Sequence, residues 1–246
     1  MSTAAAFDRV AARYDEVWTN SAVGRAQRDQ VWREIDPLFP RGEHILDIGC
    51  GTGEDAAHLA ARGVLVEAID ASPAMVERAR RRGGFTTHVL RAEEVRQVHA
   101  LPTHYDGAIS NFGVLNCVAD LPAFLRDLAA LVRPGGTVAI CVIGRFCAWE
   151  VLYYAVRVEF GKAFRRLRGS AGSSLGVQVR YRSVREFLTP EFELRRWIGI
   201  GLFVPPSYVR LPRGLVKRLA ALDRLLAPLR LFRALADHRL LILVRQ

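Results

Sequence analysis

The chain has 246 residues, half of them hydrophobic, and a formal net charge of +10 at pH 7, which suits one α/β domain with additional segments. No apolar run is long enough to cross a bilayer, and the first residues lack the basic region and apolar core of a signal peptide, so we expect a cytoplasmic protein. The four cysteines lack the spacing of metal ligands, so we expect free thiols and no metal site.

The first part of the chain alternates strands with helices. Two N-terminal helices are predicted over residues 4–18 and 21–36. The strands read as continuous apolar runs, which is typical of parallel strands buried on both faces. We therefore predict an α/β fold with a parallel sheet and helices on both faces. The predicted strands are residues 44–48, 64–69, 85–90, 105–110 and 136–143, with helices near residues 54–62, 73–82 and 121–132.

After residue 143 the alternation breaks. A long, largely apolar helix is predicted over residues 146–168, a flexible connector over 169–174 and a short exposed strand over 177–182. Two further strands, at residues 191–200 and 240–245, are predicted to complete the sheet. We divide the chain into a core of residues 1–145, cap insertions at 146–190 and 201–238, and sheet-completing segments at 191–200 and 239–246, all within one domain.

A glycine-rich turn after the first strand is the strongest functional signal. The strand carries Asp47 near its end, and Gly49, Gly51 and Gly53 then occupy alternate positions. Glycines let the backbone turn sharply and approach a ligand closely. The turn lies at the carboxyl end of a strand, where open α/β sheets bind ligands. Asp70, at the end of the next strand, suits a carboxylate that accepts hydrogen bonds from ribose hydroxyls.

These residues alone leave two kinds of cofactor open, because NAD and adenosine cofactors both carry a ribose. Two features favour an adenosine cofactor with an amino-acid end. The carboxylate of Asp47 would be awkward beside a pyrophosphate but suits a cationic ligand. The turn also contains no Lys or Arg that could neutralise phosphate.

Five motifs resemble, in order and spacing, those of the class I S-adenosylmethionine-dependent methyltransferases: residues 45–53, 67–75, 91–95, 105–111 and 131–136. The opening segment Phe7–Asp15 resembles the start of ubiquinone and menaquinone C-methyltransferases. The resemblance covers residues 7–145. It implies a Rossmann-like, seven-stranded, mostly parallel sheet with an antiparallel last strand and helical cap insertions, and S-adenosyl-L-methionine as the cofactor.

The resemblance also implies which residues hold the cofactor. Many family members carry Asp where Arg91 stands, so Glu93 is the better candidate for the adenine contact at that motif. The implied contacts are Asp47, Gly49, Gly51, Gly53 and Asn111 for the methionine part, Asp70 for the ribose, Ala71, Met75, Ala92 and Glu93 for the adenine, and Tyr14 as a cover.

The cap segments suggest the kind of acceptor. They are rich in apolar and aromatic residues, so we predict a small hydrophobic acceptor such as a lipid, a quinone, a polyketide or a terpenoid-like compound. Methyl transfer is an in-line displacement that depends on positioning, and an oxygen or carbon acceptor usually also needs a base. The sequence leaves the catalytic residue and the methylated atom open. Candidate bases in or beside the cap are His238, Tyr153, Tyr154, Tyr181 and Tyr208.

The positive charge is concentrated in the second part of the chain. Residues 1–150 carry a net charge of −3 and residues 151–246 carry +13, which points to a partner or surface of negative potential. Leucines recur at helical spacing over residues 211–235 among basic residues, and Pro228 should split this helix. Such a helix either contacts an anionic membrane surface peripherally or packs as part of the cap.

Three other functions remain open from the sequence. A nucleic-acid methyltransferase would agree with the basic charge, but residues 111–113 lack the prolines that base-modifying members often carry after the fourth strand, and no nucleic-acid-binding module is visible. The glycine turn also fits an NAD-dependent oxidoreductase. A non-catalytic regulatory protein that binds S-adenosylmethionine would keep the same motifs.

Overall fold

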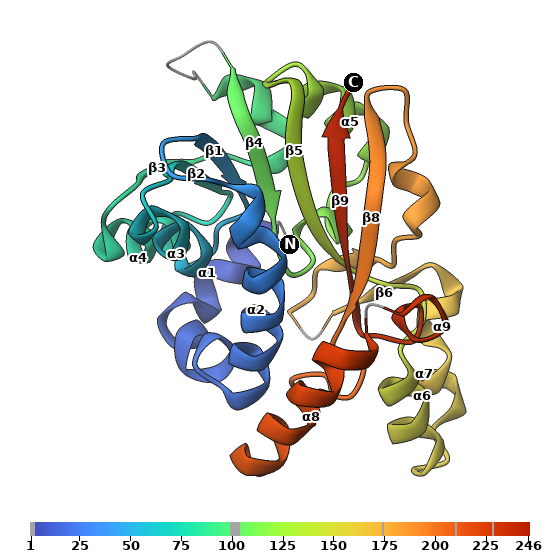
Figure 1. Cartoon of the computed structure of the whole chain (residues 1–246). Helices are drawn as coiled ribbons and strands as arrows, with labels where there is room; N and C mark the ends of the chain where they lie inside the picture. Colours follow the sequence, from blue (N-terminus) through green and yellow to red (C-terminus); the bar gives the residue numbers. More distant parts are fainter. Residues whose placement is uncertain (1–2, 99–103, 174, 210, 228) are drawn as a thin grey trace.

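A seven-stranded sheet forms the centre of the computed structural model, which describes residues 3–98, 104–173, 175–209, 211–227 and 229–246. The strands of this sheet are β1 (His44–Ile48), β2 (Leu65–Asp70), β3 (Thr86–Val89), β4 (Tyr105–Ser110), β5 (Val132–Ile143), β8 (Phe192–Ile200) and β9 (His238–Arg245). Their order is β3-β2-β1-β4-β5-β9-β8, with β9 antiparallel to both neighbours and the pairs from β3 to β5 parallel (Figure 1). The predicted α/β fold with a mostly parallel sheet is confirmed.

Helices cover both faces of this sheet. Helices α2 (Ala22–Ile35), α3 (Glu54–Ala61) and α4 (Pro73–Arg82) share one apolar cluster with Ile45 of β1, and α5 (Leu121–Ala129) shares a second cluster with Leu46 of the same strand. Successive side chains of a strand point to opposite faces, so β1 must be apolar on both. Helix α1 spans Thr3–Tyr14, before α2.

Side-chain caps set where two of these helices begin. Ser72 Oγ accepts a hydrogen bond from the backbone N–H of Met75 at 3.2 Å, and Pro73 occupies the first turn of α4. Asp120 Oδ1 accepts from the N–H of Ala123 at 2.9 Å at the start of α5. These caps satisfy N–H groups that have no partner within the helix. The predicted starts near residues 73 and 121 are confirmed.

The long helix predicted over residues 146–168 is wrong. The segment forms α6 (Ala148–Ala155), α7 (Phe160–Ala163) and the 3₁₀ turn η5 (Arg165–Arg168). Between α6 and α7, Val158 adopts a left-handed conformation with φ of +59°, which is rare for a β-branched residue and ends the helix. The apolar spacing of the segment carries no signal for this break.

The flexible connector predicted over residues 169–174 is also wrong over residues 170–172. Strand β6 (Ser170–Gly172) pairs antiparallel with β7 (Gln178–Arg180), while Ser174 lies outside the described residues. The strand predicted over residues 177–182 is confirmed at its centre by β7. Tyr181 and Arg182 at its end are buried, not exposed, and Arg182 donates to the backbone oxygens of Leu115 and Val118.

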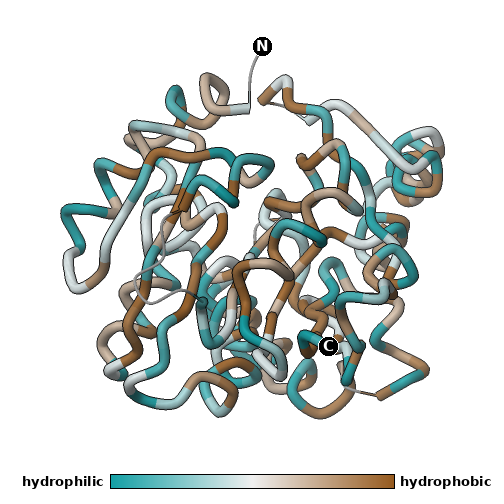
Figure 2. The backbone as a smooth tube through the Cα atoms, turned by 90° about the horizontal axis from the view of Figure 1, so that it is seen from above, coloured by the Kyte–Doolittle hydropathy of each residue, from teal (hydrophilic) through white to brown (hydrophobic). Residues whose placement is uncertain are grey.

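The second insertion contains α8 (Arg213–Leu226) and α9 (Arg230–Arg233). The predicted helix over residues 211–235 is therefore split, although Pro228 itself lies outside the described residues. Figure 1 places α6, α7 and α8 together beyond one end of the sheet. Along the part of the chain that the structure describes, no helix is long and apolar enough to cross a membrane, and Figure 2 shows hydrophobic and hydrophilic residues mixed along the trace.

A buried network of charges joins the cap to the sheet. Glu150 of α6 is 1% exposed and accepts hydrogen bonds from Arg165, Arg166 and Tyr208, at 2.9 to 3.1 Å. Arg166 in turn donates to Asp237 Oδ1 at 2.6 Å, directly before β9. The two carboxylates and two guanidinium groups balance one another, so the burial of each charge depends on the others.

Replacing one member of this network should therefore be costly. In Glu150→Ala, Arg166 stays buried without its main partner, and we expect the free energy of unfolding to fall by about 3–5 kcal/mol in urea titrations. Glu159→Ala is the matched control, because Glu159 pairs with Lys162 on the surface, and its unfolding midpoint should not move. Equal midpoints for the two variants would contradict this account of the cap.

Candidate active site

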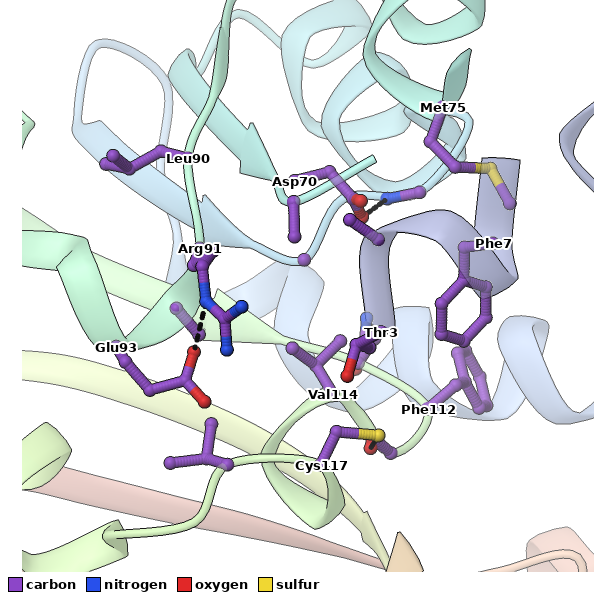
Figure 3. A pocket seen from close by; sticks show the side chains of 18 of the residues that line it. Thr3, Phe7, Asp70, Met75, Leu90, Arg91, Glu93, Phe112, Val114 and Cys117 are labelled. Carbon is purple, nitrogen blue, oxygen red and sulfur yellow. Dashed lines mark hydrogen bonds and ion pairs between the residues drawn. The ribbon is translucent and has the colours of Figure 1, made fainter. Parts of the chain in front are cut away.

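A pocket lies between α1 and the carboxyl ends of β1, β2 and β4 (Figure 3). Its lining joins segments from the N-terminal helix, the glycine turn and the loops after β2, β3 and β4. Asp47 and Gly53 are not part of the lining. Nine of the residues predicted from the sequence lie in its wall: Tyr14, Gly49, Gly51, Asp70, Ala71, Met75, Ala92, Glu93 and Asn111.

The three glycines of the turn all have positive φ, but they do different things. A Cβ at Gly49 would lie 2.4 Å from Val114 Cγ2, and one at Gly53 would lie 2.8 Å from Ala79 Cβ. At Gly51 no atom lies within 4 Å of such a Cβ, so its backbone borders open space in the pocket. Gly51 therefore offers backbone to a ligand, whereas Gly53 permits close packing of α3 on α4.

Asp70 ties together the two turns that form the floor of the pocket. Its Oδ2 accepts from the N–H of Gly51 at 2.9 Å, and its Oδ1 accepts from the N–H of Ser72 at 2.8 Å. Burial raises the pKa of this carboxyl, while these two backbone bonds lower it. A carboxylate has about four acceptor positions, so Asp70 can still accept hydrogen bonds from a ligand in the pocket.

Two buried polar atoms near the glycine turn are left without hydrogen-bond partners among the described residues. They are Oδ2 of Asp47, an acceptor, and Nδ2 of Asn111, a donor. Burial raises the pKa of Asp47 well above its ordinary value, and the nearby charge of Asp55 adds to this rise. Buried polar groups are normally paired, so an unpaired acceptor and an unpaired donor at one site indicate a polar ligand.

Arg28 is a further buried charge near Asp47, and no motif or spacing in the sequence singles it out. Its Nη1 donates to Asp55 at 2.5 Å, and its Nε has no partner in the described structure. The guanidinium lies 4.9 Å from the ring centroid of Trp18 and 5.1 Å from that of Phe112. It is thus held by two aromatic faces with one donor left over.

The N-terminal helix is fixed as a lid by two carboxylates. Asp8 Oδ1 accepts from Ser72 Oγ at 2.5 Å and from the N–H of Ala74 at 3.1 Å. Asp15 accepts from Thr52 Oγ1 at 2.6 Å and from Arg82 at 2.9 Å. Asp8 and Asp15 are far in sequence from the residues they contact, so the sequence alone does not predict these contacts. It predicts only that Tyr14 of this segment covers the pocket.

Arg91 and Glu93 form the opposite wall of the pocket (Figure 3). Arg91 Nε lies 3.6 Å from Glu93 Oε2, so the basic residue at this motif pairs with the neighbouring acid. Both side chains are partly exposed. With Arg91 at the position where many family members carry Asp, Glu93 still lies in the pocket lining, and one of its oxygens is paired with Arg91.

A second cavity of about 510 Å³ adjoins the first. The two share Tyr14 and Phe112 as lining residues. The cap insertions build most of the second cavity, from α6, η5, the β6–β7 hairpin and the loop near Tyr208. Its aromatic lining residues are Tyr14, Trp18, Phe112, Tyr154, Tyr181 and Tyr208, and its polar ones include Gln27, Arg165, Arg166, Asp237 and His238.

Phe112 forms the wall between the two cavities in an unusual conformation. Its φ is +53°, in the left-handed region that bulky residues rarely adopt. Its ring packs edge-on against Trp18, with centroids 4.7 Å apart, and against His238, at 5.6 Å. Strain of this kind is often held at functional sites. No pattern in the sequence singled out this residue.

The fold and the paired cavities define an α/β protein that binds a nucleoside cofactor beside a separate cavity built by the cap. Comparison with known proteins specifies the class further. The sequence model of a family described as a methyltransferase domain matches residues 23–179. The chain belongs to this family, and it is a class I S-adenosylmethionine-dependent methyltransferase with S-adenosylmethionine as its cofactor.

Curated relatives share the same part of the chain. A demethylmenaquinone methyltransferase of Clavibacter sepedonicus is 36% identical over 149 residues, which are 56% of each protein. A malonyl-[acyl-carrier protein] O-methyltransferase of Halorhodospira halophila is 34% identical over 150 residues, 56% of this chain and 46% of that protein. The chain thus spans about half the length of the curated relatives it matches.

Solved structures share the fold over nearly the whole chain. The CcbJ methyltransferase of Streptomyces caelestis has a TM-score of 0.64 at 15% identity and covers 100% of this chain and 99% of that one. The N-methyltransferase NodS of Bradyrhizobium japonicum, in complex with S-adenosyl-L-homocysteine, has a TM-score of 0.59 at 14% identity, with the same coverage. At such identities the likeness extends to the fold alone.

The lid should depend on its carboxylate anchors. In Asp8→Ala, α1 loses two hydrogen bonds to a charged group, each worth about 1.5–3 kcal/mol. We expect amide hydrogen exchange across residues 3–14 to become at least about tenfold faster, as measured by mass spectrometry. Glu16→Ala is the control, because its ion pair with Arg13 lies on the surface. Unchanged exchange in Asp8→Ala would contradict the role given to this anchor.

Proposed function

We propose that this chain transfers a methyl group from S-adenosylmethionine to a small-molecule acceptor held in the second cavity. The observation that carries the proposal is the contiguity of the two cavities, which share Tyr14 and Phe112. When bound, the cofactor supplies an electrophilic methyl group. Adjoining cavities would hold the two reactants in a fixed relation, and positioning of this kind supplies much of the catalysis in a displacement reaction.

We propose that residues in and near the first pocket hold the cofactor. The unpaired donor on Asn111 in the lining, together with the unpaired acceptor on Asp47 and the unpaired donor on Arg28 outside the lining, suits a carboxylate and an ammonium, which together are the amino-acid end. Asp70 keeps acceptor positions for the ribose hydroxyls. We assign the adenine to the wall formed by Ala71, Met75, Ala92 and Glu93.

Gly53 and Tyr14 take more limited parts in this proposal. Gly53 lies outside the pocket lining, so we assign it to packing against Ala79, not to cofactor contact. Tyr14 lines both cavities, and burial raises the pKa of its hydroxyl to about 12, so it stays protonated at neutral pH. Its proposed role is to cover the cofactor and to close the junction between the two cavities.

The second cavity favours a hydrophobic acceptor that contains a ring. Six aromatic side chains line it, and long aliphatic side chains are few. Flat aromatic walls pack well against flat ligands. The relatives named demethylmenaquinone methyltransferase agree with such an acceptor. The polar residues of the cavity indicate that the ring carries at least one polar substituent.

The ribose assignment of Asp70 can be tested by calorimetry. Asp70→Ala should bind S-adenosylmethionine about 10- to 100-fold more weakly, because hydrogen bonds to a charged group are lost. Glu77→Ala removes an exposed carboxylate from the neighbouring α4 and should bind like the wild type. If wild-type protein does not bind S-adenosylmethionine, the proposed function fails. If it binds and Asp70→Ala binds equally well, only the ribose assignment fails.

We also propose that the two cap insertions contact an anionic membrane surface. They expose large apolar side chains: Val156, Val158 and Phe160 at the α6–α7 turn, and Leu225 and Leu231 in α8 and α9. Helices α6, α7 and α8 lie beyond the same end of the sheet, and α9 lies beside that end (Figure 1). These exposed side chains belong to the part of the chain with a net charge of +13. Apolar insertion combined with positive charge is how peripheral proteins bind such surfaces.

Vesicle sedimentation tests this contact. Wild-type protein should pellet with phosphatidylglycerol-containing vesicles and be released by salt, and the Leu225→Glu, Leu231→Glu double variant should remain in solution. Leu65→Glu is the control, because Leu65 is an exposed leucine at the start of β2, away from the cap. Equal pelleting of all three proteins, or none with wild type, would reject the contact.

A further inference from the structure

We propose that His238 accepts a proton from a hydroxyl group of the acceptor, that Asp237 positions its ring, and that the acceptor is therefore a hydroxylated aromatic compound methylated on oxygen. This inference rests on the proposed function, because it concerns the same second cavity. It adds the base, the atom that is methylated and the class of acceptor.

His238 lies where such a base must lie. It is the first residue of β9, it is 8% exposed, and it lines the second cavity beside Phe112. Its ring centroid is 5.6 Å from that of Phe112, which forms the wall toward the cofactor pocket. His238 is thus the titratable imidazole of the described cavity lining and stands next to the junction of the two cavities.

The carboxylate of Asp237 defines which ring nitrogen is available. Asp237 Oδ2 lies 3.4 Å from Nδ1 of His238, and this nitrogen is buried without a hydrogen-bond partner in the described structure. A neutral imidazole that carries its proton on Nδ1, toward the carboxylate, has its lone pair on Nε2. Nε2 is therefore the nitrogen that can accept a proton from the acceptor.

Arg166 fixes Asp237 in turn. Its Nη2 donates to Asp237 Oδ1 at 2.6 Å and its Nη1 donates to the backbone oxygen of Asp237 at 3.0 Å. Although burial raises the pKa of Asp237, the charges of His238 and Arg166 lower it, and the net shift is downward. Asp237 is therefore ionised, with Oδ1 engaged by Arg166 and Oδ2 facing His238.

The surroundings keep His238 neutral at pH 7. Burial lowers the pKa of its imidazole, Asp237 raises it, and Arg166 of η5 and Arg239 of β9 lower it further, with a net downward shift. The other titratable groups across the cavity are Tyr14, Tyr154, Tyr181, Tyr208 and Arg165. Burial raises the pKa of Tyr14, Tyr181 and Tyr208, so these hydroxyls stay protonated at neutral pH and are not available as bases.

The strength of this base sets the kind of acceptor. A neutral amine needs no base to attack a methyl group, so an imidazole would serve no purpose there. An imidazole takes a proton more readily from a phenolic hydroxyl, with a pKa of about 10, than from an aliphatic hydroxyl, which is a much weaker acid, so this base favours a phenol. The aromatic walls of the cavity match the ring of such a compound.

In the proposed step, the hydroxyl proton of the acceptor passes to Nε2 of His238. The oxygen lone pair forms the new bond to the methyl carbon, and the electrons of the broken carbon–sulfur bond remain on sulfur. The imidazolium is stabilised by Asp237 and then releases its proton to solvent. Charge and protons balance without any further reactant.

The first measurement does not depend on turnover. The His238 resonances are assigned by their loss in His238→Gln, and the ring is titrated by NMR in wild-type protein. We expect a pKa below 6.5, a further fall in Asp237→Asn because a negative neighbour is lost, and a shift of the resonances when 1-naphthol is added with S-adenosylhomocysteine. A pKa above 6.5, or no response to 1-naphthol, overturns the proposal.

The second measurement is methylation of 1-naphthol and, separately, of 1-naphthylamine. His238→Gln should lower the rate with 1-naphthol by at least about 100-fold, as loss of a general base does. His104→Gln, which removes an exposed imidazole outside the lining of both cavities, should stay close to wild type. For wild type, kcat/KM should rise with pH with a midpoint below pH 6.5, because the neutral imidazole is the active form.

The outcomes separate this proposal from the proposed function. Calorimetry should give His238→Gln the same affinity for S-adenosylmethionine as wild type, within about twofold. Normal binding together with an undiminished rate in His238→Gln, or methylation of the amine but not of the naphthol, overturns the role of His238 alone. If His238→Gln fails to fold by circular dichroism, the NMR titration and the pH profile of wild type decide.

Discussion

The carboxylate of Asp70 is the constraint on which the cofactor site depends. One oxygen holds the N–H of Gly51 in the turn after β1, and the other holds the N–H of Ser72 in the turn after β2. Two loops that leave the sheet separately are thereby fixed to one point. Ser72 also caps α4 and donates to Asp8 of the lid. The floor of the pocket, the start of a helix and the cover over the pocket thus share a single set of hydrogen bonds, and each is ordered by the others.

The position of the cap depends on a second set of interactions, which are ion pairs between buried charges. Glu150, Arg166 and Asp237 come from α6, η5 and the residue before β9. The free-energy cost of burying each charge is offset only when its partners are present. Such a network is a poor source of stability compared with an apolar core, so its retention calls for another reason. It places one oxygen of Asp237 3.4 Å from Nδ1 of His238, and an apolar core would offer the imidazole no charged neighbour. The same contacts that hold the cap onto the sheet therefore also shape the chemistry of the second cavity.

The sheet, its mostly parallel order and the helices between the strands follow from patterns of near-neighbour residues, and these could be predicted. The same holds for the glycine turn and Asp70, because a strand end, alternate glycines and a second strand end lie within one short stretch. Other features arise from contacts between distant segments. The bonds of Asp8 to Ser72 and of Asp15 to Arg82 join residues more than 60 positions apart. Val158 and Phe112 adopt left-handed conformations although neither residue type favours them, so the sequence does not predict these turns. Gly53 belongs to the same motif as the glycines that line the pocket, but Ala79 packs where its side chain would be.

A row of packed rings connects the lid to the second cavity. Tyr14 and Trp18 have ring centroids 5.9 Å apart, Trp18 and Phe112 4.7 Å, and Phe112 and His238 5.6 Å. The first two residues belong to the N-terminal segment that Asp8 and Asp15 anchor over the cofactor pocket, and the last begins β9. Phe112 is held in a conformation that costs about 1–3 kcal/mol, and its ring contacts on both sides are what can offset that cost. Because Tyr14 and Trp18 of the lid segment both line the second cavity, a lid that is displaced from the cofactor pocket also removes part of the wall against which an acceptor would pack. The lid thus completes both cavities at once, and the acceptor site is whole only when the cofactor pocket is covered.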